Sequence, residues 1–546
     1  MKVADAVAHI LKAEGVQFLF AYPVNHLIEA AAKVDIRTVI VRQERIGLHM
    51  ADAISRLSSG RTIGVFCMQH GPGSENAFGG VAQAYGESSP ILVLPMGYPR
   101  SLSQVQPNFS SALNFRNVTK SAEQLLVPEA LADTLRRAFM AVRNGRPRPA
   151  LVEIPVDLIH AELAAAPEYR PTRTARYGPD AADVRRAADL LLAAERPVIY
   201  AGQGIHYARA WAGLQELAEL LEAPVATSLD GKSAFPETHP LALGCANRAH
   251  PATVHEFLTS ADLIFGIGCS FSITSFGVKM PAGPAIVQAT LDPADIGKDI
   301  PVEHGLVGDA QLTLQALNQE LRSRLHGQPR GRRAAVEGHI ARIRDTWLAE
   351  WMPKLTSAET PLSPYRVIWD LLHTVDVANT IITHDAGGPR DQLTPFWQAV
   401  TPLSYLGWGK TTQLGYGLGL TMGAKLACPD KLCINVWGDA AIGFTGMDFE
   451  TAARERIPIL SILLNNASMA CEIPIMQVST EKYGSTDISG NYAAMVTAFG
   501  GYGERVTAPD QIVPAIRRGI QKTQEGVPAL LEFVTAKETA ISKYMS

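Results

Sequence analysis

The sequence contains few cysteines and no strong excess of either charge. Six cysteines occur in 546 residues, and none is paired at a spacing typical of a metal site or a disulfide framework. Isolated cysteines are typical of a reduced protein, so we expect a cytoplasmic location. The formal net charge of −4 gives no basis for a nucleic-acid-binding surface.

Long apolar runs are also absent. No stretch approaches the roughly 20 apolar residues that cross a bilayer. The first residues, with Lys2, Asp5 and Lys12, favour an amphipathic helix over a signal peptide, so no membrane partner is expected. The hydrophobic share of 47% is that of a globular protein, and 546 residues are too many for one core.

Strand-like and helix-like segments alternate through three blocks of the chain. This alternation predicts an α/β fold of three doubly wound parallel sheets. Residues 166–179 and 326–333 are predicted linkers, which gives domains over 1–165, 180–326 and 355–546. The predicted strands are Phe18–Ala21, Thr38–Val41, Ile63–Cys67, Ile91–Leu94, Ala150–Ile154, Val198–Ala201, Leu263–Gly266, Ala285–Leu291, Thr380–His384, Leu432–Trp437, Ile459–Leu464 and Ala529–Val534.

The most informative motif lies in the third block. One predicted strand leads into Gly438-Asp439-Ala440-Ala441, and the next leads into Asn465-Asn466, with a helix predicted between them over 446–456. Such a crossover joins neighbouring parallel strands, so Asp439 and Asn466 are expected at the same carboxyl edge of a sheet. Carboxylate and amide oxygens suit a hard divalent cation that also holds phosphate oxygens. An ordinary β-α-β unit with Asp and Asn in its loops is the alternative.

A second motif lies near the N-terminus. Glu44 stands at the start of a predicted helix, and the following strand leads into the turn Gly71-Pro72-Gly73-Ser74-Glu75-Asn76. A surface glutamate favoured by the helix dipole is the alternative for Glu44. The two motifs in this order resemble the acetolactate synthase group of thiamine diphosphate enzymes, alongside 2-hydroxyacyl-CoA lyases and 2-oxoacid decarboxylases.

This resemblance, which extends over nearly the whole chain, implies pyrimidine-binding, central and diphosphate-binding domains. In the family's pattern, Glu44 shares a proton with the cofactor's aminopyrimidine ring and Leu414 bends the cofactor. Asp439, Asn466 and the backbone of Ser468 are the implied Mg²⁺ ligands. The other implied cofactor contacts are Gly73, Asn76, Gly387, Gly388, Gln413, Gly438, Ala440, Ala441, Met469 and Ala470. The family builds each site between two chains, which implies a homodimer or homotetramer.

Three departures from the family pattern narrow the activity. Ala440 replaces the usual glycine after the metal-binding aspartate, which we interpret as a tolerated change. The segment Gly268–Thr274 lacks the charges of the family's flavin-contacting loop, which argues against bound FAD. Ile475 lies near the position of a family tryptophan.

Glu472 lies six residues after Asn466. The 2-oxoacid decarboxylases have a glutamate at the corresponding position. The apolar sequence neighbours of Glu472 predict partial desolvation, a raised pKa and general acid–base catalysis. An exposed helix-end glutamate is the alternative. Asn25, His26 and His70 are weaker pocket candidates, since loop residues of this kind are more often structural.

The sequence therefore predicts a thiamine diphosphate- and Mg²⁺-dependent lyase or carboligase acting on a small 2-oxo acid or 2-hydroxyacyl compound. Acetolactate-synthase-like carboligation is the nearest description. A 2-hydroxyacyl-CoA lyase, with a CoA thioester as substrate, is favoured by Glu472, the Pro23-Val24 turn and the absent flavin loop. Simple 2-oxoacid decarboxylation is another alternative. A non-catalytic relative is the third, and the intact Glu44, Asp439 and Asn466 argue against it.

Overall fold

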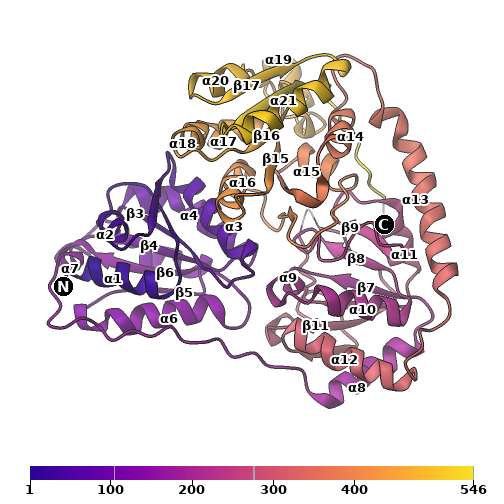
Figure 1. The fold of residues 1–546 in the computed structure, drawn as a ribbon, viewed down its shortest axis with the longest axis horizontal. Coiled ribbons are helices and arrows are strands. Elements are labelled where there is room, and N and C mark those ends of the chain that lie inside the picture. Colours follow the sequence, from indigo (N-terminus) through magenta and orange to yellow (C-terminus); the bar gives the residue numbers. More distant parts are fainter. Residues whose placement is uncertain (104, 275–276, 545–546) are drawn as a thin grey trace.

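A computed structural model describes residues 1–103, 105–274 and 277–544. It contains three six-stranded sheets, and all paired strands within them are parallel. Helices flank each sheet (Figure 1). The predicted fold class of three doubly wound parallel sheets is confirmed. In the described ranges, no helix combines the length and apolar character needed to span a membrane.

The first sheet has the strand order β2-β1-β3-β4-β6-β5. Helices α1, α2 and α6 pack on one face, and α3 and α4 pack on the other. Because both faces are covered, β3, β4 and β6 are buried along their whole length and mostly apolar, without alternation. The elements are α1 (Val3–Ala13), β1 (Phe18–Ala21), α2 (Leu27–Lys33), β2 (Arg37–Ile40), α3 (Glu44–Leu57), β3 (Gly64–Met68), α4 (Pro72–Gly86), β4 (Ile91–Gly97), α5 (Ser111–Asn114), β5 (Ser121–Gln124), α6 (Leu131–Arg143), β6 (Ala150–Pro155) and α7 (Val156–Ile159).

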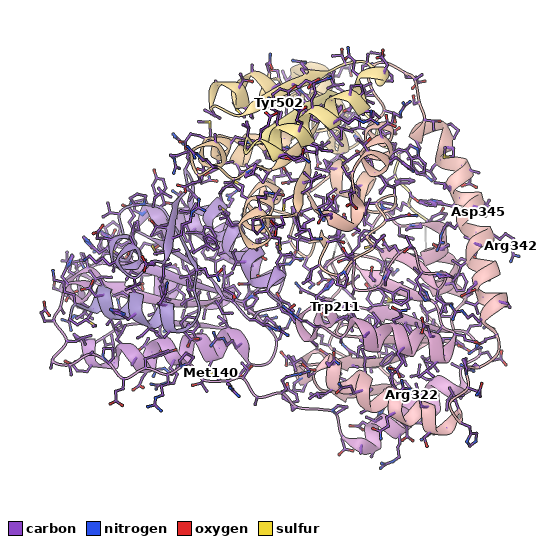
Figure 2. The ribbon with its side chains drawn as sticks, in the orientation of Figure 1. Met140, Trp211, Arg322, Arg342, Asp345 and Tyr502 are labelled. Atoms are coloured by element: carbon purple, nitrogen blue, oxygen red, sulfur yellow. The ribbon has the colours of Figure 1, made fainter. Side chains whose placement is uncertain are left out.

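The second sheet has the order β12-β11-β10-β7-β8-β9. A long helix, α13 (Arg333–Leu355), then leads to the third sheet along one edge of the molecule (Figure 1). Arg342 and Asp345 of this helix point outward (Figure 2), whereas Ile340 and Trp347 are buried. The elements are α8 (Ala181–Ala193), β7 (Pro197–Ala201), α9 (Gly204–Ala208), α10 (Trp211–Leu221), β8 (Val225–Ser228), β9 (Ala242–Ala246), α11 (Ala252–Ser260), β10 (Leu263–Ile267), β11 (Ala285–Thr290), β12 (His304–Val307) and α12 (Ala310–Arg324).

The third sheet has the order β14-β13-β15-β16-β18-β17. The helix predicted over 446–456 differs from the structure, in which α17 begins at Asp439 and a 3-10 turn, Gly446–Asp448, separates it from α18. This break lets Asp448 turn its carboxylate toward the N–H of Arg42. The elements are α14 (Pro364–Thr374), β13 (Thr380–His384), α15 (Gly388–Leu393), β14 (Tyr405–Leu406), α16 (Tyr416–Ala427), β15 (Leu432–Gly438), α17 (Asp439–Thr445), α18 (Phe449–Arg454), β16 (Leu460–Asn465), α19 (Gln477–Tyr483), α20 (Tyr492–Ala498), β17 (Tyr502–Val506), α21 (Ile512–Gln524) and β18 (Ala529–Val534).

Helices α3 and α16 pack the first and third sheets' domains together (Figure 1). Glycines on α16 permit the close approach. A Cβ on Gly419 would lie 2.5 Å from the Cβ of His49, and one on Gly423 would lie 2.5 Å from the carbonyl oxygen of Met50. One hydrophobic core therefore runs from the first sheet into the third.

Candidate functional site

The three candidate metal ligands converge at the carboxyl edge of the third sheet. Asp439 follows β15, and Asn466 follows the neighbouring strand β16. The backbone N–H of Ser468 donates to Asp439 Oδ2 at 3.2 Å and to Asn466 Oδ1 at 3.0 Å. The hydroxyl oxygen of Ser468 is buried and has no hydrogen-bond partner. The structure thus brings together all three residues that the sequence singled out.

The chemistry of this cluster fits a divalent cation shared with a phosphate group. Burial raises the pKa of Asp439, and the backbone N–H groups of Ser468 and Ala440 partly offset that effect. Among the described residues, no group of three or more His, Cys, Asp or Glu side chains could hold a metal by itself. A cation here would therefore need Asp439, Asn466, backbone oxygen and oxygens of its own ligand, which is the hard-oxygen set that Mg²⁺ takes.

Small residues border open space beside the cluster. Gly387 has φ +81°, and a Cβ added there would meet nothing within 4 Å. The nearest atoms to a Cβ on Gly438 and on Gly388 would be 3.6 and 3.7 Å away. Ala440 lies in α17 without a positive φ, and its N–H donates to Asp439 Oδ1 at 3.0 Å. Alanine in place of glycine therefore introduces no backbone strain, and the buried Ala441 continues the same helix.

A strained turn closes the cluster. Ala467 has φ +55°, in the left-handed region that favours glycine and costs other residues about 1–2 kcal/mol. Its N–H donates to the side chain of Asn465 at 3.0 Å, which helps to hold the turn. The turn returns the chain to Ser468. Met469 and Ala470 follow in the same loop, where a 3-10 turn begins.

Glu44 lies in a second cluster, in the first sheet's domain. It is the first residue of α3 and only 3% exposed. Burial raises the pKa of its carboxyl, and hydrogen bonds to its own backbone N–H and to the Asn76 side chain partly offset this. A Cβ on Gly73 would lie 3.4 Å from Glu44 Oε1. The structure therefore places Glu44, Gly73 and Asn76 together and buries the carboxyl of Glu44.

The segment that carries Leu414 faces the first domain of the same chain. Leu414 is half-buried and packs against the shared core just before α16. The side-chain oxygen of Gln413 lies 3.3 Å from His49 Nε2, and the Gln413 N–H donates to Gln83 Oε1 at 3.3 Å. Gln413 is thus held against α3 and α4.

The Glu44 cluster and the Asp439 cluster belong to different domains of the chain. Among the described residues, no hydrogen bond joins Glu44, Gly73 or Asn76 to the Asp439 cluster. Arg45 lies over the ring of Phe444 at 5.7 Å, so the start of α3 meets α17 five residues beyond Asp439.

The surroundings of Glu472 differ from the prediction. The sequence indicated a partly desolvated carboxyl, but Glu472 is exposed in the single chain. Its apolar neighbours are not packed around it, since Ile475 is 79% and Val478 64% exposed. The reason is that the 3-10 turn and the start of α19 turn these side chains outward.

The weaker pocket candidates have structural contacts. Asn25 is buried, and its amide donates to the carbonyl oxygens of Met68 and Leu94, which ties the ends of β3 and β4 together. The ring of His26 packs edge-on against His160 at 4.1 Å. His70 is half-buried and packs edge-on against Tyr98 at 4.5 Å.

Two buried carboxylates near Leu414 escaped the sequence analysis. Glu87 Oε1 accepts the backbone N–H groups of Gly409, Lys410 and Thr411 at 3.1, 2.8 and 3.3 Å. Asp385 accepts three other backbone N–H groups at the start of α15 and α16. Asp385 could have been found by the rule that identified Asp439, because both directly follow a buried strand. Glu87 follows the end of a helix and has no comparable signal.

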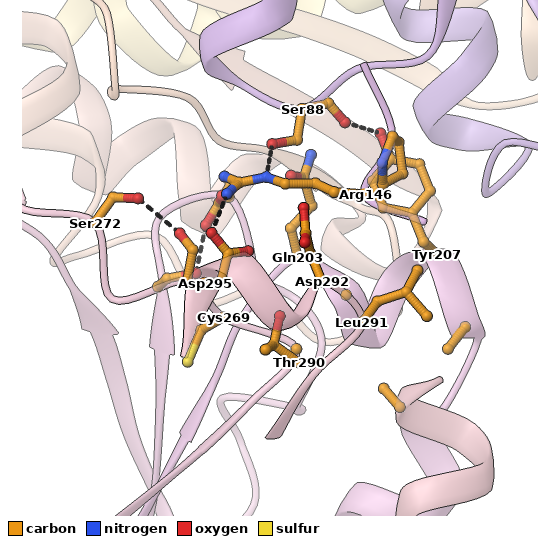
Figure 3. Close-up of a pocket in the computed structure, with 18 of the residues that line it drawn as sticks. Ser88, Arg146, Gln203, Tyr207, Cys269, Ser272, Thr290, Leu291, Asp292 and Asp295 are labelled. Carbon is orange, nitrogen blue, oxygen red and sulfur yellow. Dashed lines mark hydrogen bonds and ion pairs between the residues drawn. The ribbon is translucent and has the colours of Figure 1, made fainter. Parts of the chain in front are cut away.

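A large cavity of about 980 Å³ lies between the second sheet's domain and the first. Residues 268–274, which the sequence matched to a flavin-contacting loop, line it, and the Phe271 ring stacks on Tyr200 at 5.4 Å. Arg146 of the first domain donates to Ser88 Oγ in the same domain at 2.8 Å and to Asp295 Oδ1 in the second domain at 2.7 Å (Figure 3). The volume is in the range of small-molecule sites. The expected absence of FAD stays a prediction.

Comparison with known proteins agrees with this arrangement. Residues 1–120 match the thiamine pyrophosphate enzyme N-terminal TPP binding domain, 184–317 match the central domain, and 385–533 match the C-terminal TPP binding domain. A probable acetolactate synthase large subunit of Methanocaldococcus jannaschii is 28% identical, over 98% of this chain and 92% of that protein. The large subunit of acetolactate synthase isozyme 3 of Escherichia coli K12 is 29% identical, over 85% of this chain and 82% of that protein.

A glyoxylate carboligase of Escherichia coli O157:H7 is also similar, with 26% identity over 99% of this chain and 94% of that protein. The three domain matches follow the three sheets in order and together cover most of the chain. The chain therefore belongs to the thiamine pyrophosphate enzymes and is a thiamine diphosphate-dependent enzyme of the acetolactate synthase-like group.

Proposed function

We propose that this enzyme uses Mg²⁺ with thiamine diphosphate to form or break a carbon–carbon bond in a small 2-oxo acid or 2-hydroxyacyl compound. Acetolactate-synthase-like carboligation is the leading form of this activity. The observation that carries the proposal is the convergence of Asp439 and Asn466 on the N–H of Ser468. Similarity to both acetolactate synthases and a glyoxylate carboligase supports carboligation.

Each cluster has a defined role in this proposal. Thiamine diphosphate, when bound, would supply a nucleophilic carbon for reaction at the substrate carbonyl. Asp439, Asn466 and the backbone of Ser468 would hold Mg²⁺ beside the diphosphate. Glu44 holds or releases a proton at its buried carboxyl, whose pKa is raised by burial. Leu414 excludes water and fixes the orientation of the reacting ring.

We further propose that Glu44 of one chain and Asp439 of a second chain complete one site. The family's pattern, in which each site lies between two chains, supports this arrangement. Apolar side chains in both domains are also exposed to solvent in the single chain. Phe444 is 50% exposed, Met447 51% and Phe78 37%. A homodimer or homotetramer would bury them.

The presence of Glu472 six residues after Asn466 favours a second candidate activity, 2-hydroxyacyl-CoA cleavage or simple 2-oxoacid decarboxylation. Glu472 is exposed in the single chain, so a substrate can reach it. In this role Glu472 would pass a proton to and from substrate-derived carbon.

Product identification separates these activities. The enzyme loaded with thiamine diphosphate and Mg²⁺ is incubated with pyruvate, other 2-oxo acids and 2-hydroxyacyl-CoAs, and the products are identified by mass spectrometry. Carboligation gives a product with a new carbon–carbon bond, decarboxylation gives an aldehyde, and lyase activity cleaves the acyl-CoA. The Glu44→Gln variant is the control for background reaction. Absence of product from every substrate would refute the proposed function.

A further inference from the structure

Asp385 is a fully buried carboxylate beside the proposed site. It directly follows β13, and its backbone N–H donates to the carbonyl oxygen of Val436 at 2.8 Å. Val436 belongs to β15, the strand that leads into Asp439. The backbone of Asp385 is therefore fixed to the centre of the third sheet.

The carboxylate binds two segments that are distant in the sequence. Its Oδ1 accepts the N–H of Ala386 at 2.9 Å and the N–H of Gly415 at 3.0 Å. Its Oδ2 accepts the N–H of Gly417 at 3.0 Å. Ala386 precedes the Gly387-Gly388 turn, and Gly415 directly follows Leu414. One side chain thus connects the two loops.

The geometry at α16 leaves little freedom. Gly415 has φ +86° and is the N-cap of α16, so Gly417 carries one of the helix's first N–H groups, which have no partner inside the helix. A Cβ on Gly417 would lie 2.8 Å from the carbonyl oxygen of His384 and 3.3 Å from Asp385 Oδ2. Asp385, at the end of β13, therefore caps the N-terminus of α16.

Both carboxylate oxygens of Asp385 accept hydrogen bonds from backbone N–H groups. Burial raises its pKa to about 7, and the three backbone N–H groups limit that rise. An asparagine amide has the same shape, but its NH₂ group would face at least one backbone N–H donor. That substitution therefore removes a contact without opening a cavity.

We propose that Asp385 is a positioning residue that fixes Leu414 relative to the Gly387-Gly388 turn, so that one carboxylate sets both cofactor-contacting loops. This inference rests on the proposed roles of Leu414 and of the glycine turn. Asp385 acts through these loops and does not itself contact the substrate.

The first test uses the full chain without cofactor. Backbone amide exchange, measured by mass spectrometry, should become faster in residues 413–418 of the Asp385→Asn variant. The control is Glu153→Gln, which alters another buried carboxylate, one that accepts the N–H of Ala112 in the first domain. That control should leave exchange in 413–418 unchanged. Parent-like exchange in Asp385→Asn would overturn the proposal, whether or not the enzyme binds thiamine diphosphate.

The second test uses the enzyme loaded with thiamine diphosphate and Mg²⁺. Asp385→Asn and Leu414→Ala should each slow deuterium exchange at the thiazolium carbon by about a hundredfold, the scale of a misplacement near 1 Å. The double variant should be little slower than either, because both changes act through the position of Leu414. Additive losses, or a parent-like rate in Asp385→Asn, would overturn the proposal. If the parent enzyme binds no thiamine diphosphate, the proposed function is refuted. The amide-exchange test of Asp385 is not affected by that result.

A second variant covers the case in which Asp385→Asn does not fold. Gly417→Ala pushes the N–H away from Asp385 while leaving the carboxylate in place. It should also speed amide exchange in 413–418 and slow exchange at the thiazolium carbon. Parent-like behaviour of both measurements in this variant would count against Asp385.

Discussion

Asp448 Oδ1 accepts a hydrogen bond from the backbone N–H of Arg42 at 2.8 Å, across the boundary between the third and first domains. Thr451 donates a second hydrogen bond to the same oxygen at 2.8 Å. Arg42 lies two residues before Glu44, so the third domain holds the turn that leads into α3. Burial raises the pKa of Asp448 to about 6.

Asp448→Asn should change how stability depends on pH. The pKa of an unfolded aspartate is about 3.9, so between about pH 4 and 6 the folded protein binds more protons at this position than the unfolded chain. This contribution to stability is complete below about pH 4 and is lost as the pH rises through about 6. Denaturant titrations across this range should show a steeper fall in the parent than in the variant. The exposed Asp430→Asn is the control, and equal slopes in parent and Asp448→Asn would contradict the prediction.

Asp439→Ala should weaken binding of thiamine diphosphate in the presence of Mg²⁺. Loss of one hard oxygen ligand leaves the cation under-coordinated, so we expect a decrease in affinity of about 10- to 100-fold or more. Calorimetric titration of the metal-free protein measures it. Asp430→Ala, which alters an exposed aspartate before β15, should bind like the parent. Parent-like affinity in Asp439→Ala would remove the metal assignment.

Glu44→Gln should impair the enzyme before any substrate is present. The amide keeps the shape of the carboxyl in its buried position, but it cannot act as a general acid or base. Deuterium exchange at the thiazolium carbon should slow by about 10²- to 10⁴-fold, while the circular dichroism spectrum stays that of the parent. A parent-like exchange rate would mean that Glu44 is only a structural residue at the start of α3.

Glu472→Gln should affect only later steps. Exchange at the thiazolium carbon should stay near that of the parent, while kcat should fall roughly a hundredfold, the scale of one general acid–base group. Glu481→Gln, which alters an exposed glutamate on α19, is the matched control. Unchanged turnover in Glu472→Gln would identify it as a surface residue and favour acetolactate-synthase-like carboligation.

The purified, active enzyme should lack a flavin chromophore. The loop 268–274 that lines the large cavity carries no charged side chain, in contrast to the flavin-contacting loop expected from the family resemblance. Visible absorption of the native protein, and fluorescence of the supernatant after heat denaturation, measure bound flavin. A stoichiometric yellow cofactor would contradict this prediction and favour a flavin-containing acetolactate synthase.

The interior strands were predicted except for β8, whereas most edge strands were not. Strands such as β4 and β10 are buried along their whole length and therefore form almost continuous apolar runs in the sequence. Edge strands such as β5 and β17 are half-exposed and polar, and β14 has only two residues. No helical or strand periodicity marks them, so their pairing depends on the neighbouring strand.

The candidate clusters were predictable where chain order determines them. Asp439 and Asn466 follow adjacent parallel strands, so the topology alone brings them to one edge. The exposure of Glu472 was not predictable from its apolar neighbours, because the outward direction of the loop depends on tertiary packing. The contacts of Glu87 to residues 409–411 join segments more than 300 residues apart, and no local pattern records them.

The close packing of α3 on α16 restricts how this enzyme can be recombined with its relatives. Gly419 and Gly423 leave room for His49 and Met50, so a larger residue at either glycine would clash with α3. The first and third domains therefore have to be exchanged together, although the whole second domain lies between them in the sequence. Chimeric enzymes that exchange the third domain would need to carry a compatible α3, whereas the second domain can be exchanged without altering this helix pair.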